Sequence, residues 1–491
     1  MERGAGILMP VSALPCKYGI GGFGAPSFRF VDFLKKSGQR YWQILPLVQT
    51  GYGDSPYQTV CDYSLNPYFI DLETLFKKGL LTKRELEAQI DKSPKIDYGV
   101  LYEKRYEILR KAFSRFDVSS PSFTRFLRRE EIKNYAVFMA IKGTYNCSLQ
   151  DFPLELKRRE KAALGAFEKD KKDEIRFWAF LQFELASEWK DVKKYAKKNG
   201  ISIIGDLPLY VAADSVDVWV NPSLFEVNED LAPVKIAGVP PDYFCADGQL
   251  WGNPVYKYSE HEKDDYLWWK NRVKRSLTVY DYVRIDHFRG LDRFWSVDAG
   301  AQNARGGEWV KANGYEILKD FIGGNVIVED LGLIDDGVRE LIEKLGFPNM
   351  KVLDFAFDGD FKNPYLPWNV LENCVYYTGT HDNDTALALI ENADAGRLET
   401  IKKQVKNSLD YLEIYKDANG KYALCEEFCD IVYASRANLA MVPMHDLLLL
   451  NNDYRINEPG TVNNWVVRYR RRLLTDTLAE LLKRKVKRFE R

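Results

Sequence analysis

The sequence lacks an excess of charge of either sign, and it lacks a long hydrophobic run. Its 70 basic and 71 acidic residues leave a formal net charge of −1. Because binding to a phosphate backbone requires a basic footprint, this balance argues against generic nucleic-acid binding. No run of about 18 apolar residues, the length typical of a transmembrane helix, occurs in the chain, so we expect no membrane span.

Cysteine is scarce and irregularly spaced. The seven cysteines are an odd number, are widely dispersed and form no CxxC pair, which is typical of reduced thiols rather than of a disulfide framework. The N-terminus has Glu2, Pro10 and Pro15 where a signal peptide would have a basic region and an apolar run. We therefore expect a cytoplasmic protein.

The chain does contain enough apolar material for a large folded core. Its hydrophobic content is 46%, and 20 prolines and 33 glycines are too few for long disordered stretches. Aromatic residues make up 14%, and their flat faces suit stacking on sugars, although most aromatics pack in cores. By length alone the chain suggests about three domains, but a single α/β barrel with insertions routinely exceeds about 250 residues.

Eight short apolar segments, separated by helical patterns and ending in polar residues, glycine or proline, indicate a parallel sheet. These segments are 6–14, 41–47, 201–211, 282–285, 326–329, 350–357, 375–378 and 439–444. Eight such strands are typical of an α/β fold, the (β/α)8 TIM barrel, whose chemistry lies on the loops after the strands. We therefore expect residues 1–491 to form a single catalytic barrel.

Uneven spacing between these segments predicts insertions. Residues 75–198 are highly charged with helical periodicity, which predicts a helical insertion. Residues 214–268 are rich in proline, glycine, aspartate and aromatics without periodicity, which predicts a long ordered loop over the barrel mouth. Residues 468–491 hold ten basic and three acidic residues. A polyanion could bind this basic segment, but the leucines of the segment favour an amphipathic helix packed on the barrel.

Acidic residues follow three of the predicted strands, in RIDHFRG (284–290), VEDLG (328–332) and GTHDNDT (379–385). Residues two apart in a strand share a face, so Arg284 should point the same way as Asp286 and lower its pKa. Glu329 would meet the like charges of Asp286 and Asp382, which should raise its pKa and keep a proton available.

A carboxylate paired with a carboxylic acid is what cleavage of a glycosidic bond requires. Two alternatives remain open from these residues. The acids could cap helices or pair with arginines. Alternatively, the adjacent His/Asp pairs 286–287, 381–382 and 445–446 could ligate a catalytic metal, although no HxH spacing accompanies them.

A set of longer motifs resembles a known family. In order, they are GDLPLYVAADSVDVW from residue 205, GVPPDYFCADGQLWGNPVY from residue 238, RIDHFRG, VEDLG, GTHDND, and NEPGTVNNW from residue 457. Together they resemble the amylomaltases, the bacterial 4-α-glucanotransferases of glycoside hydrolase family 77 in the α-amylase clan. The resemblance covers essentially the whole chain.

The resemblance implies transfer of α-1,4-glucan segments between maltooligosaccharides, with retention of configuration and through a covalent glucosyl-enzyme. It makes Asp286 the nucleophile, Glu329 the acid and base, and Asp382 the stabiliser of the transition state, without metal or cofactor. The substrate-binding residues that it implies are Tyr57, Asp206, Asp242, Tyr243, Phe244, Gln249, Trp251, Arg284, His287, His381 and Asn457.

The expected partners are α-1,4-glucans and maltooligosaccharides, with no nucleic acid, membrane or obligate protein partner. In a retaining enzyme the carboxyl groups of Asp286 and Glu329 should lie about 5 to 5.5 Å apart. An α-glucan hydrolase on the same scaffold and a non-catalytic glucan-binding barrel remain as alternatives.

Overall fold

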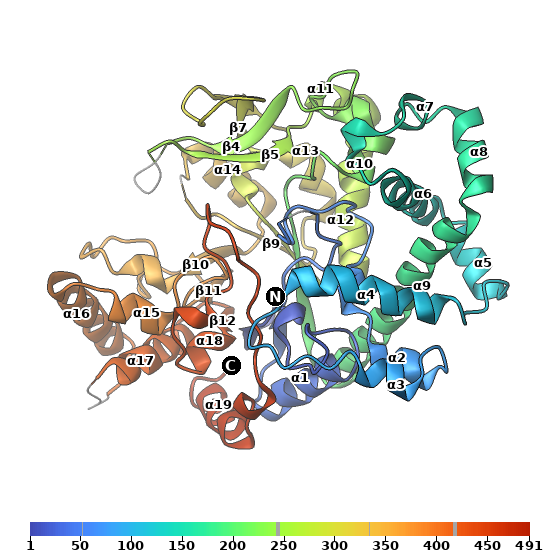
Figure 1. Ribbon diagram of the computed structural model, residues 1–491. Coiled ribbons are helices and arrows are strands. Elements are labelled where there is room, and N and C mark those ends of the chain that lie inside the picture. The colour runs from blue at the N-terminus through green and yellow to red at the C-terminus, as the bar shows by residue number, and fades with distance from the viewer. Residues whose placement is uncertain (52, 242–245, 333, 416–419) are drawn as a thin grey trace.

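The computed structural model describes residues 1–491 except 52, 242–245, 333 and 416–419 (Figure 1). Within the described residues, eight parallel strands close into a barrel in the order β1-β12-β11-β10-β9-β6-β3-β2. These strands are β1 (Gly4–Leu8), β2 (Tyr41–Gln43), β3 (Ser202–Leu207), β6 (Tyr282–Ile285), β9 (Val326–Val328), β10 (Asn349–Val352), β11 (Cys374–Tyr377) and β12 (Leu439–Pro443). The predicted (β/α)8 barrel is confirmed, and each strand overlaps one of the eight apolar segments.

The barrel strands are short and almost wholly buried, because helices cover the outside and side chains fill the inside. Register then sets which side chains meet at the mouth. Asp206 of β3 pairs with Arg284 of β6, so these two residues lie side by side on neighbouring strands. Gly205 allows this close packing, because a Cβ there would lie 2.1 Å from the ring of Tyr280.

The stretch expected to be helical, between β2 and β3, forms the blue-to-green helices that flank one side of the barrel (Figure 1). These helices are α2 (Leu72–Lys77), α3 (Lys83–Glu87), α4 (Tyr98–Phe113), α5 (Pro121–Leu127), α6 (Glu130–Tyr145), α7 (Leu154–Lys157), α8 (Lys161–Asp170) and α9 (Lys172–Lys198). Their shared core is aromatic. The ring centroid of Phe116 lies within 6 Å of the ring centroids of Phe123, Phe180 and Phe183. The long helix α9 then leads directly into β3.

Residues 214–268 contain more regular structure than the long ordered loop that the sequence predicted. They contain α10 (Val216–Val220), β4 (Lys235–Val239), β5 (Gln249–Pro254) and α11 (Tyr258–His261). β4 and β5 join β7 (Arg293–Asp298) and β8 (Glu308–Lys311) in an antiparallel sheet of order β5-β4-β7-β8. The sheet combines strands from both sides of residue 268, and β4 and β5 pair through an irregular register, so the predicted insertion does not coincide with one structural unit.

The remaining helices surround the barrel or follow its last strands. They are α1 (Ala25–Lys36), α12 (Leu267–Val279), α13 (Gly314–Leu318), α14 (Asp336–Leu345), α15 (Ala386–Glu391), α16 (Ala395–Tyr411), α17 (Lys421–Ala434), α18 (Met444–Leu447) and α19 (Asp476–Arg488). α19 is the predicted amphipathic helix, and it buries Ala479, Leu482 and Val486 while Leu481 stays exposed. No helix in the described part of the chain is both long and apolar enough to cross a membrane.

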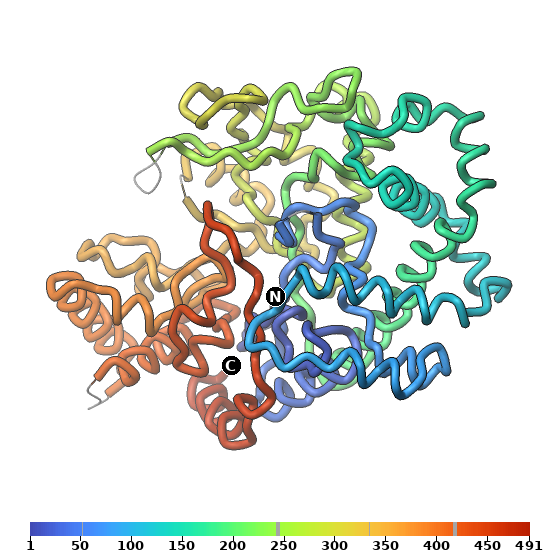
Figure 2. Tube along the Cα trace, in the orientation of Figure 1, coloured from blue at the N-terminus to red at the C-terminus, as the bar shows by residue number. Residues whose placement is uncertain are grey.

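The chain after β12 returns across the barrel mouth before it reaches α19. Figure 2 shows this segment in red beside the blue N-terminal part of the chain. Backbone hydrogen bonds join the two parts, from Ile96 N–H to the Val466 carbonyl and from Tyr469 N–H to the Ala13 carbonyl. The mouth is therefore built from segments that are more than half the chain length apart in sequence.

Candidate functional site

The carboxyl ends of the barrel strands open into a cleft of about 2070 Å3. Its lining combines the loops after the strands with α4, α6, β5 and the returning C-terminal segment. Nine of the predicted site residues line it, namely Tyr57, Gln249, Trp251, Asp286, His287, Glu329, His381, Asp382 and Asn457. Asp206 and Arg284 are buried directly beneath them. Asp242, Tyr243 and Phe244 lie outside the described residues.

Arg284 is the centre of charge under the cleft. Its Nη1 donates to both carboxylate oxygens of Asp206 at 2.7 Å and lies 2.9 Å from Asp286 Oδ1. Its Nη2 lies 3.8 Å from Glu329 Oε2. One buried guanidinium thus holds three carboxylates, and the predicted common face of Arg284 and Asp286 is confirmed.

Burial raises the pKa of Glu329 to about 7, although Arg284 and the N–H of His287 oppose the rise and the like charge of Asp382 adds to it. The predicted direction is confirmed, but loss of solvent contributes more than like charge. Burial also raises the pKa of Asp286 above its usual range, against the opposing charge of Arg284. Arg284 lowers this pKa as predicted, but burial outweighs the guanidinium, so the expected net lowering of the Asp286 pKa was wrong.

The turn after β6 brings the two acids together. His287 adopts a left-handed backbone conformation, with φ of 47°, and its N–H donates to Glu329 Oε2 at 2.5 Å. Burial lowers the pKa of the His287 imidazole to about 3, so the ring is neutral. Trp251 packs edge-on against it, with ring centroids 4.7 Å apart.

Tyr57 links the β3 side of the site to the β11 side. Its hydroxyl donates to Asp206 Oδ2 at 2.7 Å and lies 2.9 Å from His381 Nε2, and its ring stacks on His381 at 5.4 Å. Because the single phenolic proton goes to Asp206, the oxygen accepts from His381, which assigns the Nε2–H tautomer. Burial lowers the pKa of His381, in keeping with a neutral ring.

Asp382 follows β11 and is held from the C-terminal segment. Asn457 Nδ2 donates to Asp382 Oδ1 at 2.5 Å, and Asn457 N–H donates to the His381 carbonyl at 3.0 Å. The other oxygen, Oδ2, lies 3.3 Å from His381 Nε2. With 42% of its side chain exposed, the Asp382 carboxylate remains open to the cleft.

The strand β5 supplies a side wall. Trp251 Nε1 donates to Gln249 Oε1 at 3.1 Å, and Gln58 Nε2 donates to the Trp251 carbonyl at 3.0 Å. Gln58 therefore ties this strand to the loop that carries Tyr57. Gln249 and Trp251, both predicted from the GQLWGNP part of one motif, therefore lie side by side at the mouth.

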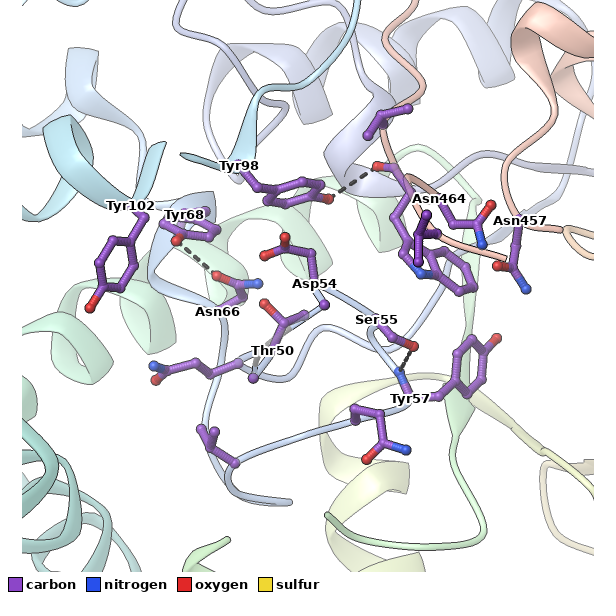
Figure 3. Close-up of a pocket in the computed structure, with 18 of the residues that line it drawn as sticks. Thr50, Asp54, Ser55, Tyr57, Asn66, Tyr68, Tyr98, Tyr102, Asn457 and Asn464 are labelled. Atoms are coloured by element: carbon purple, nitrogen blue, oxygen red, sulfur yellow. Dashed lines mark hydrogen bonds between the residues drawn. The ribbon is translucent and has the colours of Figure 1, made fainter. Parts of the chain in front are cut away.

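Sequence reasoning missed part of the lining. Tyr98, Tyr102 and Tyr106 of α4 line the cleft, and Figure 3 shows Tyr98 and Tyr102 near Asp54 and Tyr68. Tyr98 donates to the Trp465 carbonyl at 3.1 Å, so the helical insertion touches the C-terminal segment. The spacing of four between these tyrosines is a helical face that could have indicated a functional wall.

Trp465 is a second missed residue, although the motif NNW contains it. Its ring packs on Tyr57 at 5.7 Å and on His381 at 6.1 Å. Trp465 therefore packs behind the rings of Tyr57 and His381, which connect Asp206 to Asp382. The third His/Asp pair predicted as a metal alternative, His445 and Asp446, is buried outside the cleft lining, where Asp446 accepts from the Thr378 hydroxyl and the Ala386 N–H. Among the described residues, no group of His, Cys, Asp and Glu could hold a metal ion.

Comparison with known proteins identifies the family. The family model described as 4-alpha-glucanotransferase, glycoside hydrolase family 77, matches residues 9–475. A 4-alpha-glucanotransferase of Clostridium butyricum is 42% identical over 488 residues, covering 97% of this chain and 98% of the relative. One from Aquifex aeolicus is 40% identical and covers 94% of both chains.

Solved structures agree. The amylomaltase of Streptococcus agalactiae in complex with acarbose superposes with a TM-score of 0.93 at 35% identity and covers 100% of both chains. The amylomaltase of Corynebacterium glutamicum shares the fold at 19% identity, with a TM-score of 0.81 over 99% of this chain and 75% of that one. The chain therefore belongs to the 4-alpha-glucanotransferase family, glycoside hydrolase family 77, and is an enzyme that transfers α-glucan chains.

Proposed function

We propose that the cleft carries out a double displacement on α-1,4-glucans with Asp286 as nucleophile, Glu329 as acid and base, and Asp382 as stabiliser of the transition state. The observation that carries this proposal is the position of Asp286 and Glu329 at the two ends of one buried guanidinium. A pKa of about 7 for Glu329 supports its role, because a general acid works best near the operating pH.

In the first step Glu329 protonates the glycosidic oxygen while the Asp286 carboxylate attacks the anomeric carbon. The carbon–oxygen bond of the donor breaks, the leaving segment keeps the proton, and an ester joins the remaining segment to Asp286. In the second step Glu329 takes the proton of an acceptor 4-hydroxyl, whose oxygen attacks the same carbon and releases Asp286. Two inversions give overall retention, and no metal or cofactor takes part.

The division of roles between the two acids follows from their distances to Arg284. Asp286 lies 2.9 Å from the guanidinium and Glu329 lies 3.8 Å from it. The closer cation favours the ionised form of Asp286, so the proton shared by the pair resides on Glu329. Asp382 completes the set with an open carboxylate, suited to the sugar hydroxyls and to the positive charge that develops at the anomeric carbon.

Transfer rather than hydrolysis requires a sugar acceptor to reach the ester before water does. The aromatic side chains around the site, among them Trp251, Trp465 and Tyr57, support this outcome because they offer sugar-sized apolar faces and reduce water in the cleft. The hydrolase alternative differs only in this last step. The free thiols among the described cysteines support a reducing compartment, and we propose the cytoplasm.

Incubation with maltotriose tests the proposal, with the products resolved by chain length over time. We expect glucose together with a ladder of longer maltooligosaccharides. Glucose and maltose without longer products would instead establish a hydrolase, and an unchanged substrate would point to a binding protein or to a different sugar. The Asp286→Asn variant is the control for contaminating activity, because it keeps the shape of the cleft but lacks the nucleophile.

A further inference from the structure

The C-terminal segment is fastened to the loop after β11 by one arginine. Arg455 uses all three of its side-chain nitrogens. Its Nε donates to the Asn457 carbonyl at 2.9 Å, its Nη1 to Asp384 Oδ1 at 2.6 Å, and its Nη2 to the Asp382 carbonyl at 3.1 Å. We propose that Arg455 is a positioning residue that sets the Asp382 carboxylate for the reaction, with Asp384 as its anchor.

Arg455 does not itself face the substrate. Neither Arg455 nor Asp384 is among the residues that line the cleft, although Asp382 and Asn457 are. Arg455 therefore acts through these two neighbours. It fixes the backbone of Asp382 from one side, and it fixes the backbone of Asn457, whose amide donates to Asp382 Oδ1.

Asp384 is anchored in its turn. Asn452 Nδ2 donates to Asp384 Oδ1 at 2.8 Å, and Asn452 Oδ1 accepts from Thr385 N–H at 3.1 Å. Asn452 thus holds the end of this loop at the consecutive residues Asp384 and Thr385, while Arg455 also reaches the carbonyl of Asp382. The carboxylate of Asp384 orients the guanidinium, so that Nη2 and Nε aim at two carbonyls at once.

The chemistry favours arginine at this position. A guanidinium is planar and always charged, and it presents its donors in a rigid fork, whereas an ammonium is a single point of charge. A lysine at residue 455 could pair with Asp384 but could not reach both carbonyls in fixed directions. This proposal rests on the proposed role of Asp382, because a misplaced carboxylate matters only if it acts in the transition state.

The prediction concerns turnover rather than binding. The Asp382 carboxylate interacts most strongly where positive charge develops, so a shift in its position should lower kcat and leave KM nearly unchanged. A displacement of about 1 Å can cost about 100-fold in rate. We expect about this loss of kcat in maltotriose disproportionation for Arg455→Ala, and a smaller loss of about tenfold for Arg455→Lys.

The experiment compares Arg455→Ala, Arg455→Lys, Asn457→Ala and the double variant of Arg455→Ala with Asn457→Ala. Arg470→Ala is the matched control, since Arg470 is an exposed arginine of the same segment. Circular dichroism and melting temperature are measured for each variant. Because Arg455 and Asn457 act on one carboxylate, their losses should be less than additive.

Several outcomes overturn the inference. These are a kcat within twofold of wild type for Arg455→Ala, a loss confined to KM, fully additive losses in the double variant, or full activity in Arg455→Lys. If Arg455→Ala fails to fold, Arg455→Lys alone decides between the expected partial loss and its absence. Failure of the proposed function is separate, because the wild-type enzyme would then form no ladder from maltotriose.

Discussion

One nitrogen of Arg284 lies 2.7 Å from each carboxylate oxygen of Asp206. The two residues are register partners on β3 and β6, and the carboxylate of Asp206 is wholly buried. Asp206 therefore fixes the direction in which the guanidinium faces Asp286 and Glu329. It also adds a negative charge that raises the pKa of Glu329.

The variant Asp206→Asn should move the pH dependence of the reaction. Loss of this like charge lowers the pKa of Glu329, and release of Arg284 acts in the same direction. The basic limb of the kcat/KM profile should therefore shift to lower pH, whatever the size of the overall loss. Glu262→Gln, an exposed acid outside the cleft, is the control. A basic limb that stays in place in Asp206→Asn would contradict this electrostatic account.

The wild-type enzyme should give a bell-shaped profile of kcat/KM against pH. Protonated Glu329 is lost as the pH rises through about 7, so activity should fall about tenfold for each further pH unit. On the acid side, activity requires ionised Asp286, whose raised pKa puts this limb above that of an ordinary carboxyl group. The two limbs belong to the coupled pair. A profile that is flat up to pH 9 would show that another group donates the proton.

The variant Glu329→Gln separates the acid role from folding. It should lose at least about 100-fold in kcat with maltotriose, because the leaving sugar is no longer protonated. With an α-maltosyl fluoride donor, whose leaving group needs no proton, the release of fluoride should recover. Asp286→Asn should lose activity with both donors. Equal recovery in the two variants would remove the distinction between acid and nucleophile.

Trp251 should influence the choice between sugar and water. Its ring packs on His287 beside the site of the ester, so Trp251→Ala opens the wall to water and weakens acceptor binding. We expect a higher ratio of hydrolysis to transfer, measured as reducing ends formed per longer product. Trp309→Ala is the matched control, because Trp309 is a partly exposed tryptophan of β8, outside the cleft lining.

The terminal helix offers a paired test of packing. Leu482 is 2% exposed and Leu481 is 39% exposed, so they differ in burial at adjacent positions of α19. Leu482→Ala should destabilise the protein by about 2 to 5 kcal/mol, and Leu481→Ala by less than about 0.5 kcal/mol. Denaturant unfolding of the two variants measures both changes. Equal losses would mean that α19 does not pack as described.

The barrel and its central acids could be predicted from the sequence because both leave local signals. Each barrel strand is a short apolar run, and Asp286, Glu329 and Asp382 lie within five residues after the ends of three of these strands. Parallel strands place such residues at the same end of a barrel. The order of the elements alone therefore predicts that the three acids lie together at the mouth of the barrel.

Other features depend on contacts between distant segments. The sheet of β4, β5, β7 and β8 mixes strands from two parts of the chain, so no single stretch shows its pattern. Tyr98 and Tyr102 line the cleft, but they lie in the helical insertion. The many charged residues of this insertion indicated a solvated surface rather than part of a substrate-binding cleft. The pKa of Asp286 depends on burial and on how many carboxylates share Arg284, which the spacing of two residues does not reveal.

The central claim is that Asp286 forms an ester with the transferred sugar. The Glu329→Gln variant supplies the most direct measurement, because it should accept an α-maltosyl fluoride donor but release the ester slowly when no acceptor is present. Quenching, digestion and peptide mass spectrometry should find a maltosyl group on the peptide that contains Asp286. An unmodified Asp286 peptide under conditions of fluoride release, or a sugar attached to another residue, would contradict the account.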